Sequence, residues 1–151
     1  MHFVTGGAYN GKTAWVEKHY ASNDANDMCW IDASDKTTKW PNMKEITSSV
    51  FILKNLEQWI WIWLSELPDI ESVRSYGYEK ILELIAWEKH LQTRQVIIIG
   101  TDMSKGIVPM NAVLRDWRDI TGRIYQDVIQ LATQVDLIWY GLATNLKKKG
   151  K

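Results

Sequence analysis

The sequence predicts an α/β domain with a mostly parallel β-sheet, helices on both faces of the sheet and a strand hairpin at the C-terminus. Short apolar, β-prone runs alternate with longer segments whose apolar residues recur at helical spacing. The run from Val96 to Ile99 is apolar at every position, which is typical of a strand covered on both faces. The first β-prone run leads directly into a glycine-rich loop and then a helical pattern.

The elements follow one another along the whole chain. Strands are expected at residues 2–5, 28–31, 49–53, 95–99, 135–140 and 142–146, and helices at 13–20, 56–67, 70–92 and 112–133. Gly77 is a point at which the third helix could be broken. Residues 22–27 are expected to form a polar turn, and residues 33–44 and 100–109 to form loops. Ligands of such sheets bind beyond the carboxyl ends of the strands, so residues 6–13, 32, 54–57 and 100–109 are expected at one rim.

The loop at residues 6–13 has the pattern G-x-x-x-x-G-K-T of a P-loop, or Walker A motif. Between a strand and a helix, such a loop points backbone N–H groups and the positive end of the helix dipole at a polyphosphate. Lys12 would reach the terminal phosphates, and the Thr13 hydroxyl would bind Mg²⁺. An ordinary glycine turn is the alternative, but it does not account for Lys12 and Thr13. The predicted nucleotide-binding residues of the loop are Gly6, Gly7, Ala8, Tyr9, Asn10, Gly11, Lys12 and Thr13.

Length and composition narrow the class of protein. The chain has 151 residues, which suits a single nucleotide-binding domain over residues 1–151. Its 18 basic and 18 acidic residues balance, so we expect no nucleic-acid partner and a solvated tail at the lysine-rich residues 147–151. Cys29 is the only cysteine, which excludes a disulfide framework and is typical of the reducing cytoplasm. No apolar run approaches the roughly 20 residues of a membrane helix.

The chain contains nine tryptophans, which is unusual for its length. Trp59, Trp61 and Trp63 cannot all lie on one face of a helix, so that helix is apolar most of the way round. We expect it to be buried, either in the core of the domain or against another subunit of a homo-oligomer.

Four blocks of the sequence are similar to a known enzyme family. Residues 3–8 with Gly11, Lys12 and Thr13 resemble the start of adenosylcobinamide kinase/adenosylcobinamide-phosphate guanylyltransferase, which acts in cobalamin biosynthesis. Residues 50–64 and 135–147 are also similar to segments of this family. The most specific block looks like the family's G-I-V-P-x-N…R-D-x-x-G-R-x-N-Q signature, with Tyr125 in place of the Asn, and consists of Gly106, Ile107, Val108, Pro109, Asn111, Arg115, Arg118, Asp119, Gly122, Arg123 and Gln126.

The resemblance implies a nucleotide-dependent kinase. Such an enzyme transfers a phosphoryl group from ATP or GTP to the hydroxyl of the aminopropanol arm of adenosylcobinamide, a corrinoid, and assembles into oligomers. The sequence does not indicate which base is preferred, because no N-K-x-D motif is present. The resemblance also implies that the arginines of the 112–133 helix organise the nucleotide site or a subunit contact, and we predict nucleotide binding for Arg123. The alternative is a surface of salt bridges with Asp116 and Asp119.

Two departures from the family pattern bear on catalysis. No histidine lies between His19 and His90, so the histidine that the family guanylylates has no counterpart, and guanylyltransferase activity is not expected. The carboxylate that ends the third strand in the family is Lys54 here, and a lysine close to a metal ion opposes cation binding. Glu57 is a candidate substitute Mg²⁺ ligand, although an exposed helix residue is the favoured interpretation.

A third departure lies before the G-I-V-P loop, where the family's glutamate is Asp102. We predict that Asp102 orients Mg²⁺ or accepts the proton of the acceptor hydroxyl. The alternative is a turn aspartate that caps Ser104. Asp32, which closes the second strand, is either a turn residue or an outer-shell metal group.

Two further classes of function remain open. A catalytically degenerate homologue would bind nucleotide without forming product and would gain no affinity from Mg²⁺. An interaction protein that keeps only the scaffold would have no nucleotide affinity. The retained Lys12 argues against the interaction protein, because a scaffold does not need that side chain.

Overall fold

The computed structural model describes residues 1–21, 27–104 and 106–148. Residues 22–26 of the predicted turn and residues 149–151 of the predicted tail lie outside this described part. The strands are β1 (His2–Gly6), β2 (Met28–Asp32), β3 (Val50–Lys54), β4 (Gln95–Thr101), β5 (Gln134–Trp139) and β6 (Leu142–Lys147). The helices are α1 (Lys12–His19), α2 (Leu56–Glu66), α3 (Ile70–His90) and α4 (Ala112–Leu131), with a 3₁₀ turn, η2, at Met43–Glu45.

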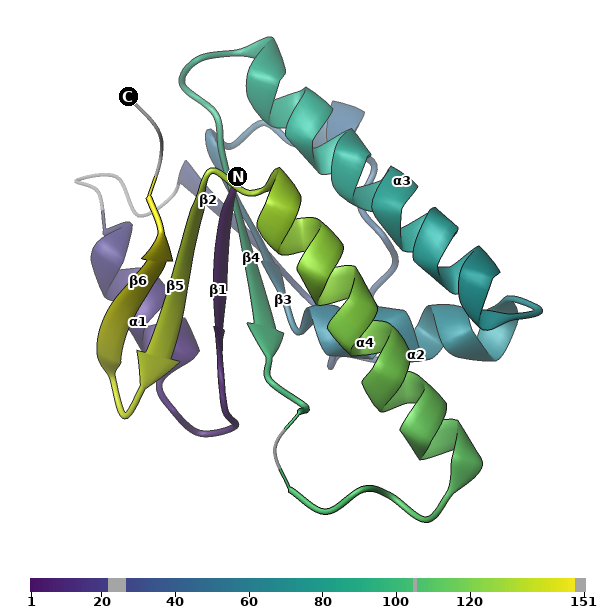
Figure 1. The fold of residues 1–151 in the computed structure, drawn as a ribbon. Helices are drawn as coiled ribbons and strands as arrows, with labels where there is room; N and C mark the ends of the chain where they lie inside the picture. The colour runs from purple at the N-terminus through teal and green to yellow at the C-terminus, as the bar shows by residue number, and fades with distance from the viewer. Residues whose placement is uncertain (22–26, 105, 149–151) are drawn as a thin grey trace.

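The strands form one six-stranded sheet in the order β2-β3-β4-β1-β5-β6 (Figure 1). Neighbouring strands from β2 to β5 are parallel, and β6 pairs antiparallel with β5 through a tight turn. This arrangement confirms the predicted fold class, including the C-terminal hairpin. The carboxyl ends of the five parallel strands all lie at one edge of the sheet, where the loops that follow them can meet.

Helices cover both faces of the sheet, as predicted. Figure 1 shows α1 on one face and α3 and α4 on the other. Successive side chains of β1 therefore pack on opposite faces of the sheet. Phe3 packs into the core beneath α2, α3 and α4, whereas Val4 packs with Val16 of α1. None of the helices in the described part of the chain has the length and hydrophobicity that crossing a bilayer requires.

Helix α3 runs without a break through Gly77, so the break considered at this residue is wrong. A Cβ atom at Gly77 would lie 3.1 Å from Cδ1 of Ile124 on α4 and 3.2 Å from the Trp63 ring on α2. The glycine therefore allows three helices to approach one another closely rather than bending one of them.

The tryptophan-rich helix α2 is only partly buried. Trp59 and Trp63 are each 3% exposed and pack against Trp40, with ring centroids 5.2 and 5.5 Å apart. Trp61 is 36% exposed and contacts Trp117 edge to face at 4.9 Å. Trp59 and Trp63 thus fill the core, while Trp61 lies at the surface.

Candidate functional site

The glycine loop (residues 6–13) joins the end of β1 to the start of α1. Gly6 has a φ of 149°, and a Cβ atom at this position would lie 2.2 Å from the carbonyl oxygen of Ile138. Gly11 has a φ of 86° and directly precedes α1. Because Gly11 has no side chain to cap the helix, the N–H groups of the first turn stay open toward the loop.

Lys12 begins α1, and its side chain folds back over the loop. The residue is 8% exposed, and its ammonium donates a hydrogen bond to the Gly7 carbonyl at 2.8 Å. Burial lowers the pKa of Lys12; the carboxylates of Glu57 and Asp102 oppose this shift, and the ammonium of Lys54 adds to it. Among the described residues, this buried ammonium bonds to a neutral carbonyl and to no carboxylate, so it is well placed to bind an anion.

A pocket of about 530 Å³ opens over the glycine loop. It brings together the loop and the ends of β3 and β4, which are the segments that the sequence places at one rim. The lining residues are Ala8, Tyr9, Gly11, Lys12, Thr13, Ala14, Lys54, Asn55, Ile99 and Thr101. Lys12, Thr13 and Lys54 thus share one space, with the positive helix end beneath it.

Glu57 is not the exposed helix residue that the sequence favoured. It is 5% exposed, and its Oε2 accepts a hydrogen bond from the Thr101 N–H at 3.0 Å. The hydroxyl of Tyr125 shares its one proton between the Thr101 carbonyl at 2.8 Å and the same Oε2 at 3.3 Å. Burial, reinforced by the charge of Glu57, raises the pKa of Tyr125, which stays a donor. The Glu57 carboxylate therefore joins α2, β4 and α4.

Tyr125 also explains a glycine that the sequence left without a role. A Cβ atom at Gly100 would lie 2.5 Å from the Tyr125 hydroxyl, so β4 needs a glycine where this ring approaches. In the sequence, this contact could have been inferred only from the end of β4, where Gly100 and Thr101 follow an apolar run.

Asp102 forms a turn with Ser104, which is the alternative to the catalytic role predicted for it. Its Oδ1 accepts hydrogen bonds from the Ser104 N–H at 2.8 Å and the Ser104 hydroxyl at 2.6 Å. Its own N–H donates to the carbonyl of Gly6 at 2.8 Å, which fixes the residue beside the glycine loop. Asp102 lines a smaller pocket, of about 240 Å³, between this turn and α4.

The arginines of α4 hold the preceding loop rather than forming salt bridges with Asp116 and Asp119. Arg115 donates to the carbonyls of Pro109 and Met110, at 3.1 and 2.5 Å. Arg118 donates to the carbonyls of Ile107, at 3.4 Å, and of Ser104. These contacts tie the G-I-V-P segment to the first turns of α4.

Arg123, the arginine predicted to bind nucleotide, lines the smaller pocket together with Asp102. Its guanidinium lies 3.6 Å from the Glu71 carboxylate of α3, and both side chains are at least half exposed. The structure does not place Arg123 in the lining of the pocket over the glycine loop. It lies instead in the smaller pocket, across from the Asp102 turn.

The ends of β2 and β3 carry a charged pair at the same edge. The ammonium of Lys54 lies 3.8 Å from Oδ2 of Asp32. Oδ1 of Asp32 accepts from the Asn55 amide at 2.6 Å and from the N–H and hydroxyl of Ser34 at 2.9 and 2.8 Å. Burial raises the pKa of Asp32, but these hydrogen bonds outweigh it, and the net shift is downward. Asp32 is thus a turn residue bonded to its neighbours.

The lining of the pocket does not fit a magnesium ion held in the usual way. Mg²⁺ in phosphate-binding sites is normally held through one or two carboxylates together with the phosphates. Thr13 offers its hydroxyl, but the charged lining residues are Lys12 and Lys54. Within residues 1–21, 27–104 and 106–148, no group of three or more His, Cys, Asp or Glu side chains could hold a metal.

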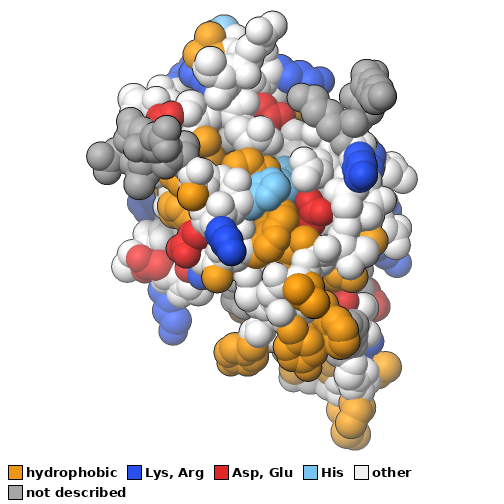
Figure 2. Space-filling model, turned by 90° about the vertical axis from the view of Figure 1, so that its left-hand side faces the viewer, with side chains coloured by type: hydrophobic (Ala, Val, Ile, Leu, Met, Phe, Trp, Pro, Cys, Tyr) orange, Lys and Arg blue, Asp and Glu red, His pale blue; other side chains and the backbone are white. Residues whose placement is uncertain are grey.

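The C-terminal hairpin reaches the glycine loop, a contact that the sequence did not predict. The N–H of Gly141, at the tip of the hairpin, donates to the Asn10 carbonyl at 2.8 Å. Figure 2 shows the side of the molecule that carries α1 and β6, with hydrophobic side chains gathered at its lower end. The exposed large hydrophobic residues of the loop and the hairpin are Tyr9, Trp139, Tyr140, Leu142 and Leu146.

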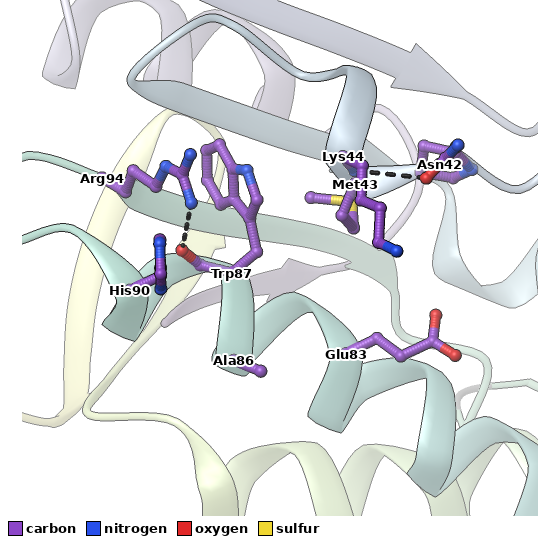
Figure 3. Close-up of a pocket in the computed structure, with 9 residues that line it drawn as sticks. Asn42, Met43, Lys44, Glu83, Ala86, Trp87, His90 and Arg94 are labelled. Carbon is purple, nitrogen blue, oxygen red and sulfur yellow. Dashed lines mark hydrogen bonds between the residues drawn. The ribbon is translucent and has the colours of Figure 1, made fainter.

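A larger pocket, of about 700 Å³, lies between α3 and residues 41–44 (Figure 3). In this pocket the guanidinium of Arg94 stacks over the Trp87 ring, 4.6 Å from its centroid, and donates a hydrogen bond to the Trp87 carbonyl at 3.0 Å. This pocket lies near the amino ends of β3 and β4, away from the glycine loop. None of the site residues predicted from the sequence lines it, so it is not the candidate site.

The protein belongs to the P-loop class of α/β proteins. This class is defined here by the strand order of the sheet, the glycine loop and the buried Lys12 at the start of α1. The model of the cobinamide kinase / cobinamide phosphate guanyltransferase family matches residues 32–146. The chain therefore belongs to this family, whose members act in cobalamin biosynthesis on cobinamide substrates with nucleoside triphosphates. The glycine loop precedes the matched range. No curated protein matches the chain.

Proposed function

We propose that this protein binds a nucleoside triphosphate at the glycine loop and transfers its terminal phosphoryl group to the hydroxyl of a cobinamide-type corrinoid. The observation that carries the proposal is the buried ammonium of Lys12 beside an open helix N-terminus, in a chain of the cobinamide kinase family. Backbone N–H groups of residues 7–12 would cradle the phosphates, and Lys12 would stabilise the charge that develops on them.

The acceptor would enter from the smaller pocket. Asp102 lines this pocket and is bonded to the glycine loop through Gly6, so it would orient the acceptor hydroxyl or accept its proton. The acceptor oxygen then bonds to the terminal phosphorus, the bridging bond breaks, and a nucleoside diphosphate leaves. Arg123, on the other wall, would bind polar groups of the acceptor or the nucleotide.

We infer that guanylyl transfer does not take place by the family's route. The chain has three histidines. His2 is fully buried and bonded to Asp136, His19 is stacked on Trp15 of α1 with centroids 4.5 Å apart, and His90 lines the remote pocket. None of these positions corresponds to the family's guanylylated histidine.

A second candidate function is nucleotide binding without transfer. It is favoured by the end of β3, where Lys54 stands in place of a carboxylate, and by the internal hydrogen bonds of Glu57 and Asp102. A protein of this kind would hold the nucleotide as a ligand without forming product.

Calorimetric titration of ATP and GTP into wild type and Lys12→Ala tests the proposal, followed by mass-spectrometric detection of phosphorylated adenosylcobinamide. Binding that is lost in Lys12→Ala, together with product, supports the kinase. Binding without product supports the second candidate. If neither nucleotide binds to the folded wild type, both fail and an interaction protein that keeps only the scaffold remains.

A further inference from the structure

We propose that the ammonium of Lys54 takes the place of a metal ion at the terminal phosphates, so that the protein binds metal-free nucleoside triphosphate. This inference rests on the proposed nucleotide site and concerns the form of the ligand that the site accepts. A divalent cation in a phosphate site is normally held by carboxylates, but the lining of this pocket offers two lysines instead, Lys12 and Lys54.

Lys54 is positioned by the strand that carries it. It is the last residue of β3, and Ile52, two residues earlier, packs on the α1 side of the sheet. Side chains two residues apart in a strand point to the same face, so Lys54 also points to the α1 side, where the glycine loop lies. It accordingly lines the same pocket as Lys12 and Thr13.

The carboxylates around the pocket are engaged with other partners. Glu57 accepts from the Thr101 N–H at 3.0 Å, Asp102 from Ser104 at 2.6 and 2.8 Å, and Asp32 from Asn55 at 2.6 Å. Freeing any of them for a metal would leave donors without partners, which costs stability. None of the three belongs to the pocket lining.

Lys54 itself is held loosely. Its ammonium lies 3.8 Å from Asp32, at the outer limit of an ion pair, and both side chains are about one-third exposed (30% and 36%). Exposed pairs of this kind contribute little, so the ammonium can turn toward a phosphate at small cost. Asp32 keeps its hydrogen bonds from Ser34 and Asn55 when Lys54 turns away.

The charges of the pocket fit the proposed ligand. Lys54 adds a second positive charge beside that of Lys12, at the place where a metal ion would otherwise bring charge, and each ammonium donates hydrogen bonds to phosphate oxygens. A divalent cation added beside them would be repelled by both. The class of ligand is therefore a nucleoside triphosphate, or another polyphosphate, without bound metal.

Calorimetric titration of ATP in EDTA and in excess Mg²⁺ tests the proposal on wild type, Lys54→Met and Lys54→Asp. We expect wild type to bind ATP more tightly in EDTA than in excess Mg²⁺, because chelation by Mg²⁺ withdraws the metal-free nucleotide that the site accepts. Lys54→Met should weaken binding in EDTA by about tenfold, the usual scale of one charge-assisted hydrogen bond. Lys54→Asp should bind poorly in EDTA and regain affinity with Mg²⁺, because it restores a carboxylate at the strand end.

Lys89→Met, which removes an exposed lysine of α3, is the matched control and should bind ATP like wild type. Thermal unfolding confirms that each variant is folded. Wild-type binding that requires Mg²⁺ and is lost in Lys12→Ala would overturn the role of Lys54 and leave the nucleotide site standing. Equal affinity of wild type and Lys54→Met in EDTA would overturn it as well. Absence of ATP binding in both buffers would overturn both proposals.

Discussion

The carboxylate of Glu57 accepts a hydrogen bond from the backbone N–H of Thr101, 3.0 Å away, and so ties the first turn of α2 to the end of β4. Glu57→Ala leaves that buried N–H without an acceptor, and we expect it to lower the free energy of unfolding by about 2–3 kcal/mol. Glu57→Gln keeps an acceptor and should cost about 1 kcal/mol or less. Urea denaturation measures both.

The same pair of variants separates the structural role of Glu57 from the role of metal ligand considered for it. If the carboxylate held Mg²⁺, Glu57→Gln would remove a gain of ATP affinity with Mg²⁺ and leave stability nearly unchanged. We expect the opposite result. Glu57→Ala should lower the free energy of unfolding, and the change of ATP affinity with Mg²⁺ should be the same in both variants.

Lys12 is expected to reduce stability in the absence of ligand. Its folded pKa lies below the ordinary value of 10.5 because the ammonium is buried, so the unfolded chain holds this proton more tightly. The contribution of Lys12 to stability therefore rises as the pH increases from its folded pKa toward 10.5. Lys12→Met should raise the free energy of unfolding at pH 7 by about 1 kcal/mol while abolishing nucleotide binding.

Lys18→Met is the matched control, since Lys18 is exposed on the same helix. It should change stability by less than about 0.5 kcal/mol. Chemical denaturation between pH 7 and 10 makes the comparison. A Lys12→Met protein less stable than wild type at pH 7 would show that the bond to the Gly7 carbonyl outweighs the burial of the charge.

A buried chain of hydrogen bonds links Tyr20, His2 and Asp136 at the opposite end of β1. Nε2 of His2 lies 2.6 Å from Oδ2 of Asp136, and Nδ1 contacts the Tyr20 hydroxyl. An ionised carboxylate only accepts, so Nε2–H donates to Asp136 and Nδ1 accepts from Tyr20. Burial, which outweighs the hydrogen bond to Asp136, lowers the pKa of His2.

Because the folded pKa lies below the unfolded value of 6.5, His2 contributes its full stability above pH 6.5 and loses it as the pH falls toward the folded pKa. We expect the melting temperature to fall between pH 7 and 5 in wild type and to fall less in His2→Gln. His90→Gln, at an exposed position of α3, serves as the control. Parallel melting profiles for wild type and His2→Gln would rule out this linkage.

Trp59 is buried and Trp61 is exposed on the same helix, α2, so their substitution should lower the free energy of unfolding by unequal amounts. Trp59→Ala empties a buried site beside Trp40 and should cost about 3–5 kcal/mol. Trp61→Ala removes an exposed ring and should cost about 1 kcal/mol. Light scattering after size exclusion would show whether Trp61→Ala also reduces the molar mass, as expected if this surface joins subunits of a homo-oligomer. An unchanged mass would place any subunit contact elsewhere.

The sequence predicted those parts of the fold that depend on local pattern. The glycine loop, the strand at β4 and the long helix α4 all carry their periodicity or their glycines within a short window. The alternation of these elements was enough to predict a parallel sheet, and with it the edge at which the loops meet.

The parts that were missed depend on contacts between distant segments. Glu57 reads as a surface residue because its partners, Thr101 and Tyr125, lie more than forty residues away along the chain. The unbroken course of α3 through Gly77 depends likewise on its packing against α2 and α4. For Asp102 the short spacing to Ser104 did indicate a turn, but not that the turn is bonded to Gly6.

If the glycine loop binds a nucleotide as proposed, the bond from Gly141 to Asn10 gives the C-terminal hairpin a part in binding it. A loop rich in glycine has much conformational entropy to lose when an anion binds. Here the hairpin already holds the centre of the loop, so that part of the entropy is lost on folding rather than on association. A preorganised loop of this kind would favour a fast encounter with the proposed nucleotide, and the rate of association would then depend on residues of the C-terminal hairpin.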